Sequence, residues 1–249
     1  MRASLPAGRL AGRFAKALAA PLALAAALAG LAPAAPAAAA SAACLPGPGV
    51  QPVNPGTQVD KLQGVTVLSA CNAWAVGFES DDFTLGTDKT LIEHWDGKSW
   101  TVLPSPDPGN TLNELTSVRA ISPANIWAVG FFDNGTGPRT LTVHWNGIKW
   151  KRVPSPNPGG PKRRNELDAV TASSATSARA VGTFTDPVLG QTTLILRWNG
   201  TRWTHVVAPA SELGELLAVT GTSPASSWAV GDSFDPNGQV IQAMALHCC

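Results

Sequence analysis

The sequence predicts an all-β fold, namely a four-bladed β-propeller of four-stranded antiparallel blades. Three observations predict it: a four-residue signature recurs about every fifty residues, a second signature follows most copies of the first, and only 14% of the residues are charged. Repeats of this length are typical of propeller blades and solenoids, and the low charge excludes a long charged helix or coiled coil. A chain of 249 residues is long enough for one medium domain or two small ones.

Residues 1–43 have the pattern of a secretory signal peptide, and residues 44–249 are expected to form the propeller domain. Four basic residues come before an Ala/Leu run at about 17–31, and small residues lead to Ala43. This order predicts a secreted mature chain with no membrane span, because no other apolar stretch is long enough to cross a bilayer. Cys44 directly follows the small residues, so a lipid anchor on Cys44 is the alternative, although the Leu of a lipobox is absent.

The charge of the mature part bears on the class of partner. After residue 43 the formal charge is about −3, and basic residues cluster only at Lys162-Arg163-Arg164. A polyanion-binding surface needs a larger basic patch. We therefore expect no nucleic-acid partner.

The first signature defines four units. Trp-Ala-Val-Gly begins at Trp74, Trp127 and Trp228, and the third copy is Arg-Ala-Val-Gly at Arg179, so the spacings are 53, 52 and 49 residues. The small residues let a neighbouring sheet approach closely, while Trp and Val fill the space between blades.

The second signature, Trp-Asp/Asn-Gly-Xaa-Xaa-Trp, occupies residues 95–100, 145–150 and 198–203. Asp-Gly and Asn-Gly are typical of a tight β-hairpin turn. A two-residue turn puts Trp95 opposite Lys98, with both tryptophans on one face of the blade as packing residues.

Each unit is therefore expected to contain four short strands, a to d. In the second unit they are expected at 115–121, 127–131, 140–145 and 149–153. The segments Pro-Ser-Pro-Asp-Pro-Gly (104–109) and Pro-Ser-Pro-Asn-Pro-Gly (154–159) end the units before them, because proline cannot continue a strand ladder.

The two signatures resemble those of secreted, actinobacterial-type Trp-Ala-Val-Gly repeat proteins, which are similar to kelch and galactose-oxidase-type propellers. The resemblance covers about residues 50–248 and implies a binding or surface role rather than a particular reaction. The chain departs from the pattern at Arg179 and lacks the paired glycines of kelch repeats. It also contains no tyrosine, from which the copper site of a galactose oxidase is partly built.

The two ends of the chain are expected to close the ring. The fourth unit stops after its strand c at about Cys248, whereas residues 51–56 match the stretch that follows a strand d in the first unit. We expect an N-terminal strand at 45–50 to complete the last blade, which favours a monomer. The alternative is a fragment of a longer propeller with open edges.

The chain contains four cysteines, Cys44, Cys71, Cys248 and Cys249. Four cysteines can form two disulfides in three different pairings. Ring closure favours two disulfide bridges that tie Cys44 and Cys71 to Cys248 and Cys249. The alternatives are a Cys44–Cys71 bridge with a vicinal Cys248–Cys249 pair, or free thiols. Metal binding by the cysteines is not expected, because exported cysteines are normally oxidised.

Three histidines occupy one repeat position on strand c, where each is expected to cover the neighbouring tryptophan: His94, His144 and His247. Equivalent positions on different blades do not converge on one ion, so we expect no metal site there. His205 stands alone on a strand d and is expected to be exposed. Three glutamates also recur, which favours a turn or cap role: Glu114, Glu166 and Glu215.

The loops between strands b and c are the best candidates for a binding site, because blades fix the scaffold and loops carry specificity. A phenylalanine with nearby carboxylates recurs in these loops and suits a sugar or a peptide, and two or more of the acids could hold Ca²⁺. The expected ligand contacts are Asp82, Phe83, Asp133, Asp186, Phe234 and Asp235. The alternative is that the acids are solvated and the phenylalanines pack beneath the rim.

We therefore expect a secreted, non-catalytic binding module that recognises an extracellular protein or carbohydrate through one loop face. The alternative is an extracellular glycan hydrolase or lyase with Asp82 and Asp186 as acid and base. No cofactor other than that Ca²⁺ is expected.

Overall fold

The structure is a computed structural model that describes residues 44, 50–56, 58–81, 87–207, 213–223, 225–235, 237 and 241–248. All of them belong to one compact unit, Ala42–Cys249. The expected signal peptide lies outside the described residues. The described residues form no helix that is long and apolar enough to cross a membrane.

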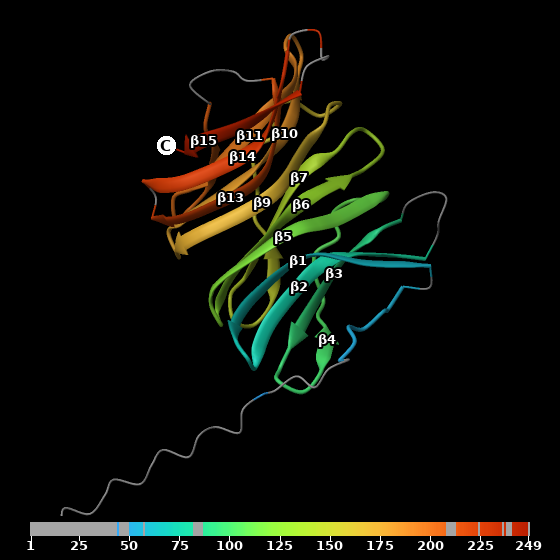
Figure 1. The fold of residues 1–249 in the computed structure, drawn as a ribbon. Helices are drawn as coiled ribbons and strands as arrows, with labels where there is room; N and C mark the ends of the chain where they lie inside the picture. The colour runs from blue at the N-terminus through green and yellow to red at the C-terminus, as the bar shows by residue number, and fades with distance from the viewer. Residues whose placement is uncertain are drawn as a thin grey trace, which may run out of the picture. The chain divides into compact units, whose positions relative to one another are not determined.

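The described strands form four antiparallel sheets, one for each repeat unit (Figure 1). The first contains β1 (Val59–Ser69), β2 (Asn72–Ser80), β3 (Lys89–Trp95) and β4 (Trp100–Val102). The second contains β5 (Leu112–Ser122), β6 (Asn125–Asp133), β7 (Arg139–Trp145) and β8 (Trp150–Arg152). The third contains β9 (Asn165–Ser174), β10 (Ser177–Asp186), β11 (Gly190–Trp198) and β12 (Trp203–His205). The fourth contains β13 (Gly214–Ser223), β14 (Ser226–Phe234) and β15 (Ile241–Cys248). Strands adjacent in sequence pair in every sheet, so the all-β, four-bladed propeller class is confirmed.

The first strand of each sheet is its inner strand, and β1, β5, β9 and β13 contact one another in chain order. Each inner strand pairs with the strand that carries the first signature. The glycine of the signature allows this pairing: a Cβ on Gly130 would overlap the carbonyl of Glu114, and Gly77, Gly182 and Gly231 are equally crowded. The repeated glycine is therefore required by close backbone approach.

The core lies between consecutive sheets and is built from both signatures. Trp127 of the second sheet is 1% exposed, and its ring centroid lies 4.9 Å from that of Trp198 and 5.1 Å from that of Trp203 in the third sheet. The expected filling of the gap between blades by the tryptophan is thus confirmed. The cluster also includes Val129 and Leu194.

The turn inside the second signature differs from the expected one. Trp95 pairs directly with Trp100, not with Lys98, and the two indole centroids are 5.8 Å apart. The turn is wider because the Asp96 carboxylate accepts hydrogen bonds from the N–H groups of Lys98 (2.8 Å) and Ser99 (2.9 Å). Asp96 N–H in turn donates to Ser99 O at 3.3 Å.

Hydrogen bonds join each proline-rich segment to the start of the third strand of the same unit. Asp107 Oδ1 accepts hydrogen bonds from Thr90 N (2.7 Å) and Thr90 Oγ1 (2.9 Å). Asn157 Oδ1 accepts the equivalent bond from Thr140 N at 2.8 Å. These segments therefore end the units, as expected, and also hold the outer edge of the blade.

The structure does not show the expected completion of the fourth blade. In the described residues the fourth sheet has three strands, and residues 45–49 of the expected strand lie outside them. The following residues contact the first sheet instead, where Val53 N–H donates to the buried Glu93 carboxylate at 3.1 Å.

The expected equivalence of residues 54–56 and 107–109 does hold in local geometry. Gly56 N–H donates to Asp60 Oδ1 at 2.8 Å, and Gly109 N–H donates to Asn113 Oδ1 at 2.7 Å. The N-terminal segment therefore folds like the tail of an outer strand, although it lies beside the first sheet.

The favoured disulfide pairing is also corrected, because Cys44 is bonded to Cys71 and not to Cys248 or Cys249. Cys44 lies beside the turn glycine of the first sheet: a Cβ on Gly97 would lie 2.6 Å from Cys44 Sγ and 3.0 Å from Cys71 Cβ. The two cysteines thus meet on one rim of the first sheet. Cys249 and the side chain of Cys248 lie outside the described residues.

Candidate binding groove

The residues that the sequence predicted as ligand contacts have different roles in the structure. Asp82 and Phe83 lie outside the described residues. Asp133 ends β6, and its Oδ1 accepts hydrogen bonds from the N–H groups of Gly135 (2.7 Å), Thr136 (3.0 Å) and Gly137 (3.0 Å). Its carboxylate therefore organises the b–c loop. Phe132 beside it is buried between sheets, as the alternative interpretation expected.

Asp186 organises the equivalent loop of the third sheet. Its Oδ1 accepts hydrogen bonds from the N–H groups of Val188 (2.8 Å) and Leu189 (3.0 Å). The bonds from Leu189 and Val188 lower the pKa of this carboxyl. A general acid needs a raised pKa, so Asp186 is poorly suited to donate a proton in glycan cleavage.

Phe234 and Asp235, by contrast, line a cavity of about 440 Å³ between the loops of the third and fourth sheets. We call this cavity the blade 3–4 groove, and its lining residues are Leu189, Gln191, Leu213, Phe234, Asp235, Asn237 and Ile241. Four of the seven lining side chains are apolar and three are polar. A cavity of this size and composition is typical of ligand sites.

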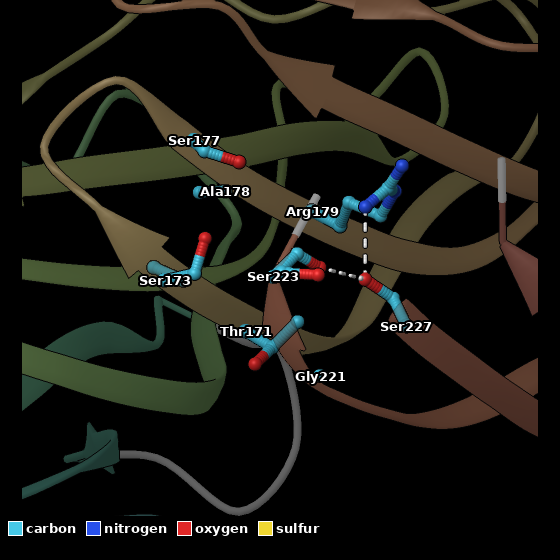
Figure 2. A pocket seen from close by; sticks show the side chains of 9 residues that line it. Thr171, Ser173, Ser177, Ala178, Arg179, Gly221, Ser223 and Ser227 are labelled. Atoms are coloured by element: carbon cyan, nitrogen blue, oxygen red, sulfur yellow. Dashed lines mark hydrogen bonds between the residues drawn. The ribbon is translucent and has the colours of Figure 1, made fainter. Parts of the chain in front are cut away.

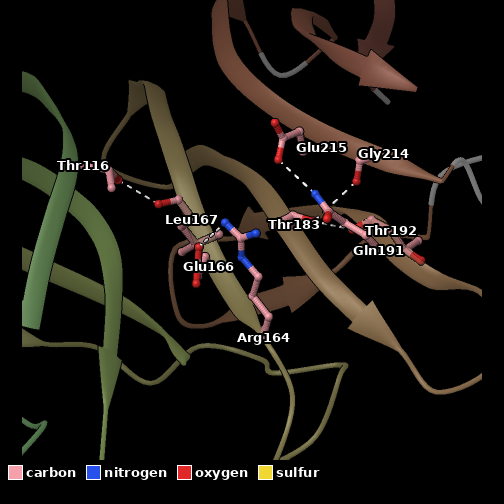
Figure 3. Close-up of polar contacts among 9 residues, drawn as sticks. All are labelled: Thr116, Arg164, Glu166, Leu167, Thr183, Gln191, Thr192, Gly214 and Glu215. Atoms are coloured by element: carbon pink, nitrogen blue, oxygen red, sulfur yellow. Dashed lines mark hydrogen bonds and ion pairs between the residues drawn. The ribbon is translucent and has the colours of Figure 1, made fainter. Parts of the chain in front are cut away.

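Backbone contacts across the two sheets hold the groove in shape. Leu213 forms a β-bridge with Thr192 of β11, and its carbonyl accepts a hydrogen bond from Phe234 N–H at 2.9 Å. Gln191 is oriented by its own contact, because its Nε2 donates to Glu215 Oε2 at 2.9 Å (Figure 3). These contacts fix the backbone of Leu213 and Phe234 and the side chain of Gln191 in the groove.

A second hollow of about 170 Å³ adjoins the groove and shares Leu189 with it. His205 lines this hollow and makes an edge-on contact with Phe184, at 5.6 Å between ring centroids. The expectation that His205 is exposed was wrong, because it is partly buried and burial lowers its pKa. Val188 and Val207 are strongly exposed nearby.

The histidines on the third strands have the expected packing role. His94 stacks on Trp74 at 4.3 Å and His144 on Trp127 at 4.4 Å between ring centroids. Burial lowers the pKa of both imidazoles. Within the described part of the chain, no group of three or more His, Cys, Asp or Glu side chains is placed to hold a metal ion.

The recurring glutamates lie on the inner strands and not before them. Glu114 accepts a hydrogen bond from Gln63 of the first sheet at 3.2 Å, and Glu215 accepts the one from Gln191 of the third sheet. Glu166 forms an ion pair with Arg164 at 2.6 Å (Figure 3). Two of the three glutamates therefore connect neighbouring sheets, which the expected turn or cap role did not include.

Asp168 lies on β9, two residues after Glu166. Burial raises its pKa to about 7, and the charges of Glu166 and Glu215 add to the effect while Arg164 opposes it. The repeat did not indicate Asp168, because other units have different residues at this position.

A much smaller pocket surrounds Arg179, the residue that replaces the signature tryptophan. Its volume is about 10 Å³, which is room for about one water molecule. Arg179 is buried, and its Nη1 donates to Ser227 Oγ at 2.8 Å (Figure 2). Ser227 Oγ in turn donates to Ser223 O at 3.2 Å. Arginine fits here because the described fourth sheet offers hydroxyl groups and no tryptophan pair.

Sequence reasoning missed the apolar half of the groove, namely Leu189, Leu213 and Ile241. These residues come from three separate loops or strand ends, and no repeat connects them. The only signal in the sequence was the exposed Val188-Leu189 pair beside Asp186, where a turn is usually polar.

Comparisons with known proteins identify no family for this chain. No protein-family model matches the chain, and no curated protein matches it. One similar solved structure is YCF48 bound to D1 peptide, with a TM-score of 0.42, 15% identity, and coverage of 73% of this chain and 52% of that chain. The chain thus spans about half the length of that protein. The propeller assignment depends on the strand pairing described above.

Proposed function

We propose that this chain is an exported binding module of the Trp-Ala-Val-Gly repeat type that holds an apolar segment of an extracellular protein in the blade 3–4 groove. The observation that carries the proposal is the cavity of about 440 Å³, which is lined by four apolar and three polar side chains. Its volume falls within the range of roughly 300–1,000 Å³ that is usual for ligand sites.

The lining residues suit a peptide segment. Leu213, Phe234 and Ile241 offer apolar surface to a partner side chain, and Gln191 and Asn237 offer amide groups to its backbone. The exposed apolar surface continues beyond the groove through Val188 and Val207. A contiguous apolar patch on a protein surface is typical of a protein-binding site.

A carbohydrate ligand is the less favoured partner. The groove contains one aromatic side chain, Phe234, and no tryptophan among its lining residues. Sugar binding of the kind expected from the sequence needs an aromatic face with several carboxylates, and Asp133 and Asp186 already accept hydrogen bonds from their own loops.

The bonded Cys44 supports export without a lipid anchor. Its sulfur is bonded to Cys71, whereas a lipid anchor would require the same sulfur atom. Disulfides persist in oxidising compartments, which agrees with the signal-peptide pattern of residues 1–43.

The test is selection of a peptide ligand from a phage-displayed library of random dodecapeptides, followed by titration of the selected peptide by fluorescence polarisation. Ile241→Ser should weaken binding roughly tenfold, because Ile241 lines the groove. Ile148→Ser is the matched control, since Ile148 is also a strongly exposed isoleucine (81%, against 67% for Ile241) and lies in a turn on the opposite rim. Equal effects of the two variants, or selection of no peptide, would contradict the proposal.

A further inference from the structure

The third strands of the first three sheets carry a threonine at one shared position, opposite the residue that follows the signature glycine: Thr90, Thr140 and Thr193. In the second sheet the proline-rich segment supplies partners for this threonine. Its hydroxyl lies 2.7 Å from Ser155 Oγ, and its N–H donates to Asn157 Oδ1 at 2.8 Å. In the first sheet Ser105 and Asp107 make the same contacts.

The third sheet lacks these partners. Thr193 is 4% exposed, and its Oγ1 has no hydrogen-bond partner. The backbone bonds of Val206 and Val153 to their third strands are equivalent, so positions 208 and 210 correspond to Ser155 and Asn157. Both positions are alanine in the sequence and lie outside the described residues. A buried hydroxyl group without a partner is costly and rare in native proteins, so this one indicates a missing partner.

Thr193 lines the second hollow, the one of about 170 Å³ beside the blade 3–4 groove. Phe184, Leu189 and Val207 give this hollow apolar walls. Its volume is below the roughly 300–1,000 Å³ of a site for a whole ligand, and it suits a single side chain. Since Leu189 also lines the groove, a peptide in the groove can place one side chain in the hollow.

The polar groups of the hollow favour a carboxamide over a carboxylate. Hydrogen bonds from Leu189 and Val188 lower the pKa of Asp186, so this lining carboxylate is ionised at neutral pH. Burial lowers the pKa of His205, so its imidazole is neutral there. A ligand carboxylate would therefore meet a negative charge with no cation among the described lining residues. A carboxamide has an oxygen that can accept from the Thr193 hydroxyl and N–H groups that can donate to Asp186.

We infer that the hollow is a specificity subsite that binds the carboxamide side chain of an asparagine in the partner peptide. The second sheet contains the same pairing within the chain, because Thr140 Oγ1 donates to Asn157 Oδ1 at 3.4 Å. In the subsite the Thr193 hydroxyl donates to the carboxamide oxygen, and the carboxamide N–H donates to the Asp186 carboxylate. This inference rests on the proposed function, since the asparagine belongs to the peptide that the groove holds.

The first experiment compares the thermal unfolding of Thr193→Val and Thr140→Val in the free protein. Valine keeps the shape of threonine and lacks the hydroxyl. Thr193→Val should leave the Tm unchanged or raise it, because its hydroxyl has no bond to lose. Thr140→Val should lower the Tm by about 4 °C, because its bonds to Ser155 and Asn157 are lost. A fall for Thr193→Val as large as that for Thr140→Val would overturn the inference, since Thr193 would then have a partner within the chain.

The second experiment titrates the selected dodecapeptide by fluorescence polarisation. We expect the selected peptides to contain an asparagine, and its replacement by leucine should weaken binding to the wild-type protein roughly tenfold. Thr193→Val should lose most of this preference, whereas the control Thr140→Val should keep it. Selected peptides without a required asparagine, or a full preference in Thr193→Val, would overturn the inference.

The variant Ile241→Ser separates failure of the subsite from failure of the proposed function. If Ile241→Ser weakens binding while the asparagine replacement has no effect, the groove binds the peptide and the subsite inference is wrong. If the asparagine and Thr193 matter while Ile241→Ser has no effect, the proposed function of the groove is wrong and the hollow remains a binding site. Selection of no peptide would overturn both.

Discussion

Replacement of Trp127 by alanine tests the inter-sheet packing that organises this fold. Trp127 is 1% exposed and contacts His144 of its own sheet and both tryptophans of the next signature. Truncation of a buried Trp or Phe to alanine costs about 3–5 kcal/mol, since both burial and packing are lost. For a domain of this size we expect a fall in Tm of about 10 °C.

The matched control is Trp228→Ala, which changes the same residue type at the same repeat position. About half of Trp228 is exposed, so its truncation should cost about 1 kcal/mol. Urea denaturation is followed by intrinsic fluorescence. Equal losses of stability for the two variants would refute the packing role of the buried signature tryptophan.

Three further perturbations test other parts of the structure. Gly130→Ala should destabilise by about 2 kcal/mol in urea denaturation, because a Cβ would overlap the Glu114 carbonyl; an unchanged midpoint would show that the inner strand can move away. The double variant Cys44→Ser/Cys71→Ser removes a disulfide with a sequence separation of 27, and the chain-entropy model gives a loss of about 3.5 kcal/mol in the free energy of unfolding. Calorimetry should therefore show a lower Tm. An unchanged Tm would mean that the N-terminal segment is not held by this bond. Asp168→Asn should stabilise the protein at pH 8 by about 4 kcal/mol and have little effect at pH 4, because a folded-state pKa of about 7 makes ionisation of Asp168 progressively costly as pH rises from about 4 to 7. Equal urea midpoints of variant and wild type at pH 8 would contradict this reasoning.

The parts of the fold that depend on local pattern were predictable from the sequence. The recurrence of the signature at Trp127 and its equivalents predicted the positions of the strands, the close backbone approach at the signature glycine and the packing role of the tryptophans. The register of the second signature was not predictable from its turn dipeptide, because the Asp96 carboxylate binds two amides and widens the turn. Side-chain acceptors of this kind change turn geometry without changing the sequence motif.

Features that join distant segments were harder to predict. The pairing of Cys44 with Cys71 depends on where the N-terminal segment lies, and an alignment of the chain ends does not determine whether they meet. Of the expected site residues, Phe234 and Asp235 line the groove, whereas the carboxylates of Asp133 and Asp186 accept hydrogen bonds from amides of their own loops. The groove also needs Leu213, which is held by contacts to two sheets that no sequence period encodes.

The most direct test of the proposed function is hydrogen–deuterium exchange of the protein with and without the selected peptide. If the blade 3–4 groove binds the peptide, amides at 188–191, 213–214 and 233–235 should become protected, while those at 69–72 and 96–99 on the opposite rim should not change. Protection on the opposite rim, or along the exposed face around Trp228, would contradict the account and place the binding site elsewhere.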